Sequence, residues 1–188
     1  MLKQWIFISL MILGLAACAG RPTHYTVDPE LRLPESFKTQ DKTVLVNVIA
    51  PESTGQLGTQ RIALAADNNF AESVKKGIVS GLINSGYKIS ANKHFSDVVM
   101  NFNFSELSVE IDPGVVKDEL IVTGKLTLTM VKKPTTFNKS FTRRQTLTVA
   151  GQASEAEVTG MTNEVVGKLL AAALADPAVA DFMQNNMK

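Results

Sequence analysis

The chain has 188 residues, of which 45% are hydrophobic and 20% are charged, and its formal charge is +1. This composition is typical of one globular domain, and the near-neutral charge excludes strong electrostatic attraction to nucleic acid or to an anionic membrane. The single cysteine, Cys18, excludes an internal disulfide and a cysteine-rich metal site.

The first 17 residues have the pattern of a secretory signal peptide. Lys3 gives a weakly positive start, residues 5–15 are almost wholly apolar, and Ala16 and Ala17 are small enough for a signal peptidase. The apolar run is shorter than the about 20 residues that a membrane-spanning helix needs. An ordinary secretory signal without lipidation is the alternative interpretation.

The stretch Leu15-Ala16-Ala17-Cys18 resembles the lipobox of bacterial lipoproteins. The resemblance implies cleavage between Ala17 and Cys18 and a covalent lipid on Cys18, whose three acyl chains would hold the protein at a membrane. By resemblance to lipoprotein sorting signals, Ala19 in place of aspartate implies the outer membrane, with the domain on its periplasmic face. Removal of Lys3 with the signal would bring the formal charge to zero.

Residues 18–42 carry Pro22, Pro29 and Pro34 among polar side chains, which favours an extended tether that lifts the domain off the membrane. Part of this segment could instead lie along a sheet edge, because leucines alternate there with polar residues. We therefore predict a signal peptide over 1–17, a lipidated cysteine and proline-containing tether over 18–42, and a single α+β periplasmic domain over 43–188.

Short strands are expected at the start of this domain. Residues 43–50 alternate apolar side chains on both faces, which predicts a strand covered on both sides. Residues 51–58 have the proline, serine and glycine content of a loop. Further short strands are expected over 61–67 and 87–90.

Two amphipathic helices follow from their capping patterns. Asn69 with Glu72 resembles a capping box, and apolar side chains then recur every four residues until Gly86. The segment 154–157, Ser-Glu-Ala-Glu, matches the capping box fully, and Asp176-Pro177 ends that helix. Within the first helix, the most plausible use of Gly77 and Gly81 is close packing against a sheet, since a phosphate-binding lysine and hydroxyl are missing. A short last helix is expected over 178–186.

Three long strands are predicted between the helices. Residues 97–111 change their apolar phase near Ser105, which predicts a β-bulge. Asp112-Pro113-Gly114 is a turn, and residues 120–130 and 137–150 form the next two strands. Short connections make the three strands antiparallel neighbours. We predict the α+β class: a two-layer sandwich with a mostly antiparallel sheet and two amphipathic helices packed on one face.

No catalytic or metal-binding constellation is found in the sequence. His24 and His94 lie far apart without further ligands nearby, and no Gly-x-Ser-x-Gly motif is present. Glu106, Glu110 and Asp112 alternate along one strand and are interpreted as part of its solvent face. We therefore expect no catalytic residue, no metal and no cofactor other than the covalent lipid.

Basic side chains gather around the last predicted hairpin: Lys132, Lys133, Lys139, Arg143 and Arg144. These residues are candidate contacts for an anionic partner, such as a glycan, a lipid headgroup or an acidic protein. Protection of an exposed sheet edge against aggregation explains them equally well.

Several segments together resemble the YajG family of bacterial lipoproteins. They are residues 44–50 followed by Leu-Gly-Thr-Gln-Arg over 57–61, residues 82–89 with Ser-Gly-Tyr over 85–87, and Asp-Pro-Ala over 176–178 leading to Phe182-Met183. The chain departs from the family over 50–53, where members carry Asp and Arg, so no role is transferred to those positions. The resemblance implies an α+β fold and outer-membrane placement, without established catalytic residues or a cofactor.

The sequence therefore predicts a non-enzymatic, lipid-anchored envelope protein that serves as a binding or scaffold module of the outer membrane. Its expected partners are the membrane, through the lipid on Cys18, and an envelope protein or glycan, with no nucleic acid. The alternatives are an accessory lipoprotein for lipopolysaccharide or lipid transport and an activator of a peptidoglycan enzyme.

Overall fold

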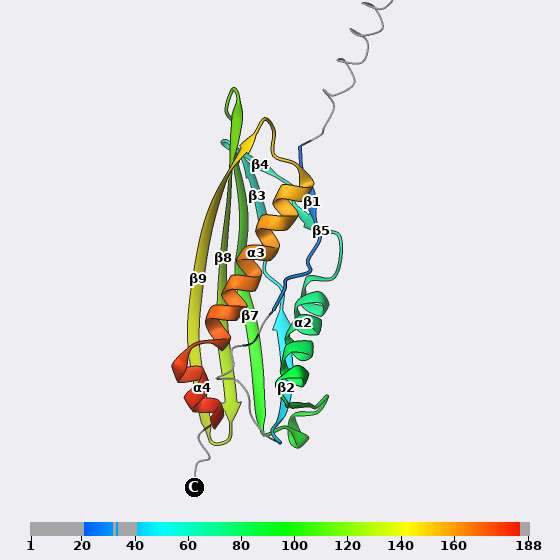
Figure 1. Cartoon of the computed structure of the whole chain (residues 1–188), viewed down its shortest axis with the longest axis vertical. Coiled ribbons are helices and arrows are strands. Elements are labelled where there is room, and N and C mark those ends of the chain that lie inside the picture. The colour runs from blue at the N-terminus through cyan, green and yellow to red at the C-terminus, as the bar shows by residue number, and fades with distance from the viewer. Residues whose placement is uncertain (1–20, 32, 34–40, 185–188) are drawn as a thin grey trace, which may run out of the picture.

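A computed structural model describes residues 21–31, 33 and 41–184. They form a curved seven-stranded sheet with helices on a single face, as Figure 1 shows, and a separate two-stranded sheet of very short strands. This is the predicted α+β sandwich. The proposed signal peptide and Cys18 lie outside the described residues, as do positions 185 and 186 of the expected last helix.

Three long antiparallel strands make up most of the sheet. They are β7 (Val98–Asp112), β8 (Lys117–Lys132) and β9 (Thr135–Ala150). The register between β7 and β8 shifts between Phe104 and Glu106, which confirms the bulge predicted near Ser105. Because of the bulge, Phe104 and Leu107 can both face the core although three positions separate them, and each is 1% exposed.

Shorter strands pair with the other edge of β7. β2 (Thr43–Ile49) runs parallel to its first half and β3 (Ser53–Leu57) runs parallel to its second half. Beyond these two lie β6 (Lys88–Ile89) and β4 (Gln60–Ile62), respectively. The sheet is therefore mixed, although antiparallel pairs dominate it.

The loop predicted over 51–58 is wrong, because residues 53–57 form β3. Their polar composition hides a strand whose pairing with β7 lies more than 50 positions away in sequence. Gly55 is buried at its centre, and a Cβ atom there would lie 2.7 Å from Ile62 Cγ1. A glycine that reads as a loop signal is therefore needed for close packing of β3.

Both predicted helices are present and begin where the capping patterns place them. α2 (Phe70–Asn84) is capped by Asn69, whose Oδ1 accepts a hydrogen bond of 3.1 Å from the Glu72 N–H. α3 (Glu155–Leu174) begins with the complete capping box of Ser154 and Glu157. α4 (Pro177–Gln184) is the short last helix.

One face of the sheet is buried and the other is open. Val44 and Val46 of β2 are fully buried under the helices, whereas Ile49 is 56% exposed and Asn47 is exposed. The expectation that both faces of residues 43–50 are covered is therefore wrong. Its physical reason is that α2 and α3 lie on the same side of the sheet, as the layers in Figure 1 show.

The expected tether is also wrong for the described residues between 21 and 33. β1 (His24–Tyr25) pairs in parallel with β5 (Ala65–Ala66), and Tyr25 and Val27 are each 1% exposed. The segment then passes between α2 and α3 (Figure 1). Its apolar residues contribute to the core instead of extending away from it.

Small residues on the two helices make room for this segment. The Cβ positions of Gly77 and Gly81 would meet Pro29 O at 3.6 Å and Leu33 Cγ at 3.2 Å, and that of Gly167 in α3 would meet Glu30 O at 3.1 Å. The predicted role of Gly77 and Gly81 in packing against the sheet is therefore corrected. These glycines face the N-terminal segment.

A buried hydroxyl on α3 gives a test of the packing. Thr162 is fully buried, and its Oγ1 atom has no hydrogen-bond partner among the described residues. Because burial of an unpaired hydroxyl costs free energy, Thr162→Val should raise the free energy of unfolding by about 1 kcal/mol in denaturant titrations. Thr159→Val is the control, since Thr159 Oγ1 accepts a hydrogen bond from the Thr26 N–H and its loss should destabilise the fold. Equal effects of the two substitutions would contradict this explanation.

Candidate functional site

A hollow of about 500 Å³ lies on the open face of the sheet, at the end where β7 begins. Its floor is a row of apolar side chains from three adjacent strands, in which Leu45 pairs with Val99 and Val99 pairs with Val131. The next row of the open face is polar, and there Asn47 Nδ2 donates to Asn101 Oδ1 at 2.9 Å. The apolar floor is therefore a local feature of a mainly polar face.

Cationic side chains surround this floor. Lys132 is the last residue of β8 and Lys133 follows it in the turn to β9, whereas Lys93 and His94 come from the short 3-10 helix η3 (Lys93–Phe95). The neighbouring Phe95 is 76% exposed. We call the floor of Leu45, Val99 and Val131 with the rim of Lys93, His94, Lys132 and Lys133 the basic hollow.

A further lysine, Lys42, lies close enough to the hollow for the charges of Lys132 and Asp97 to affect its pKa. Burial lowers the pKa of Lys42, and the charge of Lys132 lowers it further, while Asp97 opposes the shift. Lys42 Nζ donates a hydrogen bond to the Met183 carbonyl, which fixes it in place. The Asp97 carboxylate, which also lines the hollow, accepts the Thr43 N–H at 2.8 Å. Cations thus outnumber carboxylates around the basic hollow.

The five basic residues singled out in the sequence do not form one patch. Lys132 and Lys133 line the basic hollow, whereas Lys139 forms an ion pair of 2.5 Å with Asp176 at the start of α4. The hydrogen bond from Lys139 lowers the pKa of that carboxyl group. Lys139 therefore joins β9 to the helical layer.

Arg143 and Arg144 point to opposite faces of β9, because neighbouring residues of a strand alternate. Arg143 lies near Glu164 of α3, whose pKa is lowered first by the hydrogen bond from Lys168 and, to a smaller extent, by the charge of Arg143. Arg144 pairs with Thr123 on the open face of the sheet. Neither arginine lines the basic hollow.

Sequence reasoning missed the contribution of η3. Lys93 and His94 were far from the basic hairpin in sequence, and only the alignment of β2, β7 and β8 brings them to Lys132 and Lys133. A local signal for the turn exists, since Asn92 Oδ1 accepts the His94 N–H at 2.9 Å and caps η3. Nothing local shows what η3 faces.

The other candidate residues lie apart from the hollow. His24 is exposed on β1, and its Nδ1 atom lies 2.9 Å from Thr23 Oγ1. Glu106 forms an ion pair of 2.5 Å with Lys125, and Glu110 and Asp112 follow along β7. Among residues 21–31, 33 and 41–184, no group of three or more His, Cys, Asp or Glu side chains is placed to hold a metal ion.

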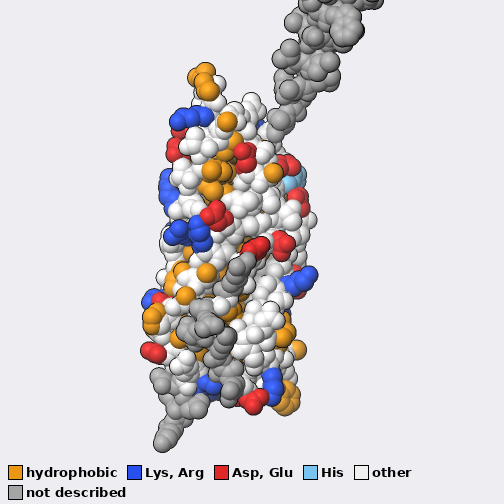
Figure 2. All heavy atoms as spheres, viewed as in Figure 1, with side chains coloured by type: hydrophobic (Ala, Val, Ile, Leu, Met, Phe, Trp, Pro, Cys, Tyr) orange, Lys and Arg blue, Asp and Glu red, His pale blue; other side chains and the backbone are white. Residues whose placement is uncertain are grey.

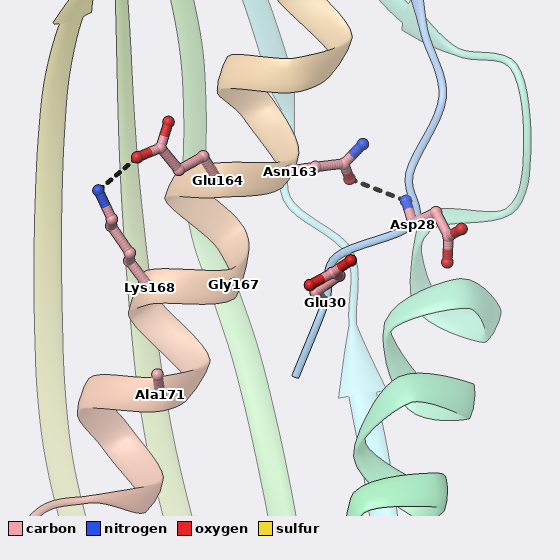
Figure 3. Close-up of a pocket in the computed structure, with 7 residues that line it drawn as sticks. All are labelled: Asp28, Glu30, Asn163, Glu164, Gly167, Lys168 and Ala171. Carbon is pink, nitrogen blue, oxygen red and sulfur yellow. Dashed lines mark hydrogen bonds and ion pairs between the residues drawn. The ribbon is translucent and has the colours of Figure 1, made fainter. Parts of the chain in front are cut away.

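A second hollow, of about 400 Å³, lies between α3 and the N-terminal segment (Figure 3). Asn163 Oδ1 accepts the Asp28 N–H at 2.8 Å, and Glu164 is paired with Lys168 on the outer side of α3. The hydrogen bond between Asn163 and Asp28 therefore holds the segment against α3. This groove is explained by the packing of the N-terminal segment.

A buried carboxylate at the opposite end of the sheet joins three parts of the fold. Asp118 is 2% exposed and accepts hydrogen bonds from Arg21 Nη1 at 2.5 Å, the Ala153 N–H at 3.0 Å and the Gly114 N–H at 3.3 Å. Burial alone would raise the pKa of Asp118, but these hydrogen bonds and the Arg21 charge lower it overall. Asp118 thereby connects the N-terminal segment, the β7–β8 turn and the start of α3.

The comparison with protein families assigns the chain to a class. A family described as uncharacterized lipoprotein matches residues 53–184, which is most of the chain. The chain belongs to this family of lipoproteins. No helix among the described residues is long and apolar enough to cross a membrane. No curated protein matches the chain in sequence.

One solved structure of low sequence identity supports the fold, and it supports the fold alone. The crystal structure of protein XCC0632 from Xanthomonas campestris, of the family DUF330, matches with a TM-score of 0.54 and 10% identity, covering 88% of this chain and 99% of that one. An uncharacterized protein matches with a TM-score of 0.47 and 11% identity, over 82% and 97% of the two chains. Lipoprotein GNA1162 from Neisseria meningitidis matches with a TM-score of 0.29 and 12% identity, covering 64% of this chain and 92% of that one.

Proposed function

We propose that this lipoprotein is a non-enzymatic binding module of the bacterial outer membrane, anchored through Cys18, which recognises an anionic envelope component in the basic hollow. The observation that carries the proposal is the combination of a row of apolar side chains with a cationic rim. Such a site suits a ligand that joins a negative group to an apolar or carbohydrate body. A volume of about 500 Å³ is within the usual range for small-ligand sites.

The proposal is for binding without catalysis, since the carboxylates with shifted pKa values serve the fold. Asp118 and Asp176 each accept hydrogen bonds from a cationic side chain and from backbone N–H groups. These hydrogen bonds explain their lowered pKa values without a catalytic role. Placement on the periplasmic face of the outer membrane rests on the lipobox resemblance and on Ala19. The proposed membership of the YajG family rests on the segments quoted from the sequence. One of these, residues 57–61, forms the turn and part of the strands of the β3–β4 hairpin.

An accessory role in lipopolysaccharide or lipid transport is the second candidate function. The same hollow favours it, because lipids and glycolipids of the envelope combine anionic groups with apolar chains. Activation of a peptidoglycan enzyme, the other alternative, requires a tether long enough to reach the cell wall. Since residues 21–31 and 33 pack on the domain, the reach available to a tether is shorter than the sequence suggested.

Charge reversal at the rim tests the proposed site. A photoreactive amino acid in place of the exposed Asn47, which lines the hollow, should capture the ligand or partner in cells that produce the intact lipoprotein. Lys132→Glu combined with Lys133→Glu should reduce the captured adduct at least tenfold, because two attractive charges become repulsive.

The control is another pair of adjacent lysines, Lys75 and Lys76 on α2, at the opposite face of the sheet. Lys75→Glu combined with Lys76→Glu should leave the adduct unchanged. Thermal unfolding monitored by circular dichroism establishes that both double variants fold. Capture that survives charge reversal in the hollow, or that falls equally in both double variants, would refute the proposed site.

A further inference from the structure

The turn between β7 and β8 exposes an apolar tip at the end of the molecule opposite the basic hollow. Val115 is fully exposed and Val116 is 80% exposed. In Figure 1 this hairpin projects beyond the other described elements at that end, and Figure 2 shows apolar side chains gathered at its tip. Tight turns normally carry polar residues or glycine, so two adjacent exposed valines call for an explanation.

The N-terminal segment begins beside the same hairpin. Arg21 is held to Asp118 by the 2.5 Å ion pair, and Asp118 also accepts the Gly114 N–H within the turn. The Gly151 N–H donates to the Val116 carbonyl at 3.0 Å, so the base of the turn is tied to the segment before α3. Arg21 and the apolar tip are therefore fixed relative to each other.

The length of chain between Arg21 and Cys18 limits where the anchor can lie. Three peptide units span at most about 11 Å between the Cα atoms of these two residues. Whatever path the chain takes, a lipid on Cys18 must enter the bilayer close to the β7–β8 turn. The hydrocarbon core of the bilayer is therefore the large apolar phase nearest to Val115 and Val116.

We infer that the β7–β8 tip is a second membrane contact, which inserts Val115 and Val116 into the surface of the bilayer that holds the lipid. The inference rests on the proposed anchoring through Cys18. Two valines alone would bind a membrane weakly, but the anchor makes the second contact intramolecular and raises its effective concentration. Asp118 brings no net charge to the bilayer surface, because Arg21 neutralises it.

This contact would also orient the domain. β7 has 15 residues, so its two ends are roughly 45 Å apart at 3.3 Å per residue. With the tip in the bilayer, the basic hollow at the other end of β7 stands away from the membrane and faces the periplasm.

Fluorescence of single labelled positions tests the contact. The full lipidated protein, with Val115→Cys or Phe95→Cys, is labelled with an environment-sensitive dye and reconstituted into vesicles of phosphatidylethanolamine and phosphatidylglycerol. The lipid blocks Cys18, so only the introduced thiol reacts. Phe95 is the matched control, because it is an exposed apolar residue at the far end of β7.

The label at position 115 should be quenched by spin-labelled lipids and should be at least threefold less sensitive to aqueous iodide than the label at position 95. Equal iodide quenching at both positions in protein that floats with the vesicles would overturn the tip contact and leave the anchor intact. Unmutated protein that fails to float with the vesicles would instead overturn the anchor, and the tip contact with it.

Discussion

Asp118→Ala should lower the free energy of unfolding by about 1.5 to 3 kcal/mol, the cost of losing charge-assisted hydrogen bonds to a buried carboxylate whose ion-pair partner, Arg21, is partly exposed. In the unmutated protein, the Asp118 carboxylate accepts the hydrogen bond of the Ala153 N–H and is the counter-ion of Arg21. The substitution removes both interactions. Urea titration followed by circular dichroism measures the loss. We expect the N-terminal segment and the β7–β8 turn to become susceptible to protease together, because Asp118 holds both.

Asp112→Ala is the matched control, since Asp112 lies in the same hairpin but is exposed. Its effect should stay within about 0.5 kcal/mol, as for most surface substitutions. A similar loss in both variants would show that the hairpin is sensitive to any change of charge, and would contradict the specific role of Asp118.

The effect of Asp118 should depend on pH in a defined direction. Since the pKa of Asp118 in the folded protein lies below its value of about 3.9 in the unfolded chain, the carboxylate stabilises the fold above that pH. This contribution is lost as the pH falls through the lowered folded pKa. The stability difference between the unmutated protein and Asp118→Asn should therefore be constant from pH 7 to pH 5 and should shrink below about pH 4. A difference that persists unchanged at pH 2 would contradict this assignment.

Loss of the lipid should release the protein from the membrane almost completely. The first 18 residues are replaced by an ordinary cleavable secretory signal, so that the mature chain begins at Ala19 without a lipid. The Val115–Val116 tip is the other proposed membrane contact, and it is small. Two valines cannot replace three acyl chains, each of which contributes about 0.8 kcal/mol per buried methylene.

Fractionation of cells measures this release. The native chain should be found with the membranes, and the chain that starts at Ala19 should be found in the soluble periplasmic fraction. An otherwise native chain with Val115→Ser and Val116→Ser is the control, and it should stay with the membranes because it keeps the lipid. Retention of the chain without the lipid would show that a contact other than the acyl chains holds the domain at the membrane.

Local signals in the sequence predicted the elements that local interactions form. The capping patterns at Asn69 and Ser154 place both helix starts correctly, because a cap depends on residues only three positions apart. The phase change near Ser105 predicts the bulge for a similar reason, since each strand alternates its faces independently of its partners. The two-layer arrangement follows, because amphipathic helices and half-apolar strands must bury their apolar faces together.

Features that depend on distant partners could not be predicted in this way. β3 lacks apolar alternation and is a strand because β7 offers it a free edge. Residues 18–42 look like a tether by their prolines, but Gly77, Gly81 and Gly167 create a place for part of this segment between the helices. Only two of the five predicted basic contacts line the hollow, because the alternation along β9 and the pairing of Lys139 with Asp176 separate the others.

The chemical state of Cys18 tests most directly whether this chain is an anchored binding module. Mass spectrometry of the mature protein purified from membranes should show an N-terminus at Cys18 whose mass includes the diacylglycerol and the acylated amine. A mature chain that begins with an unmodified residue would contradict the anchor, and with it the orientation that places the basic hollow away from the bilayer.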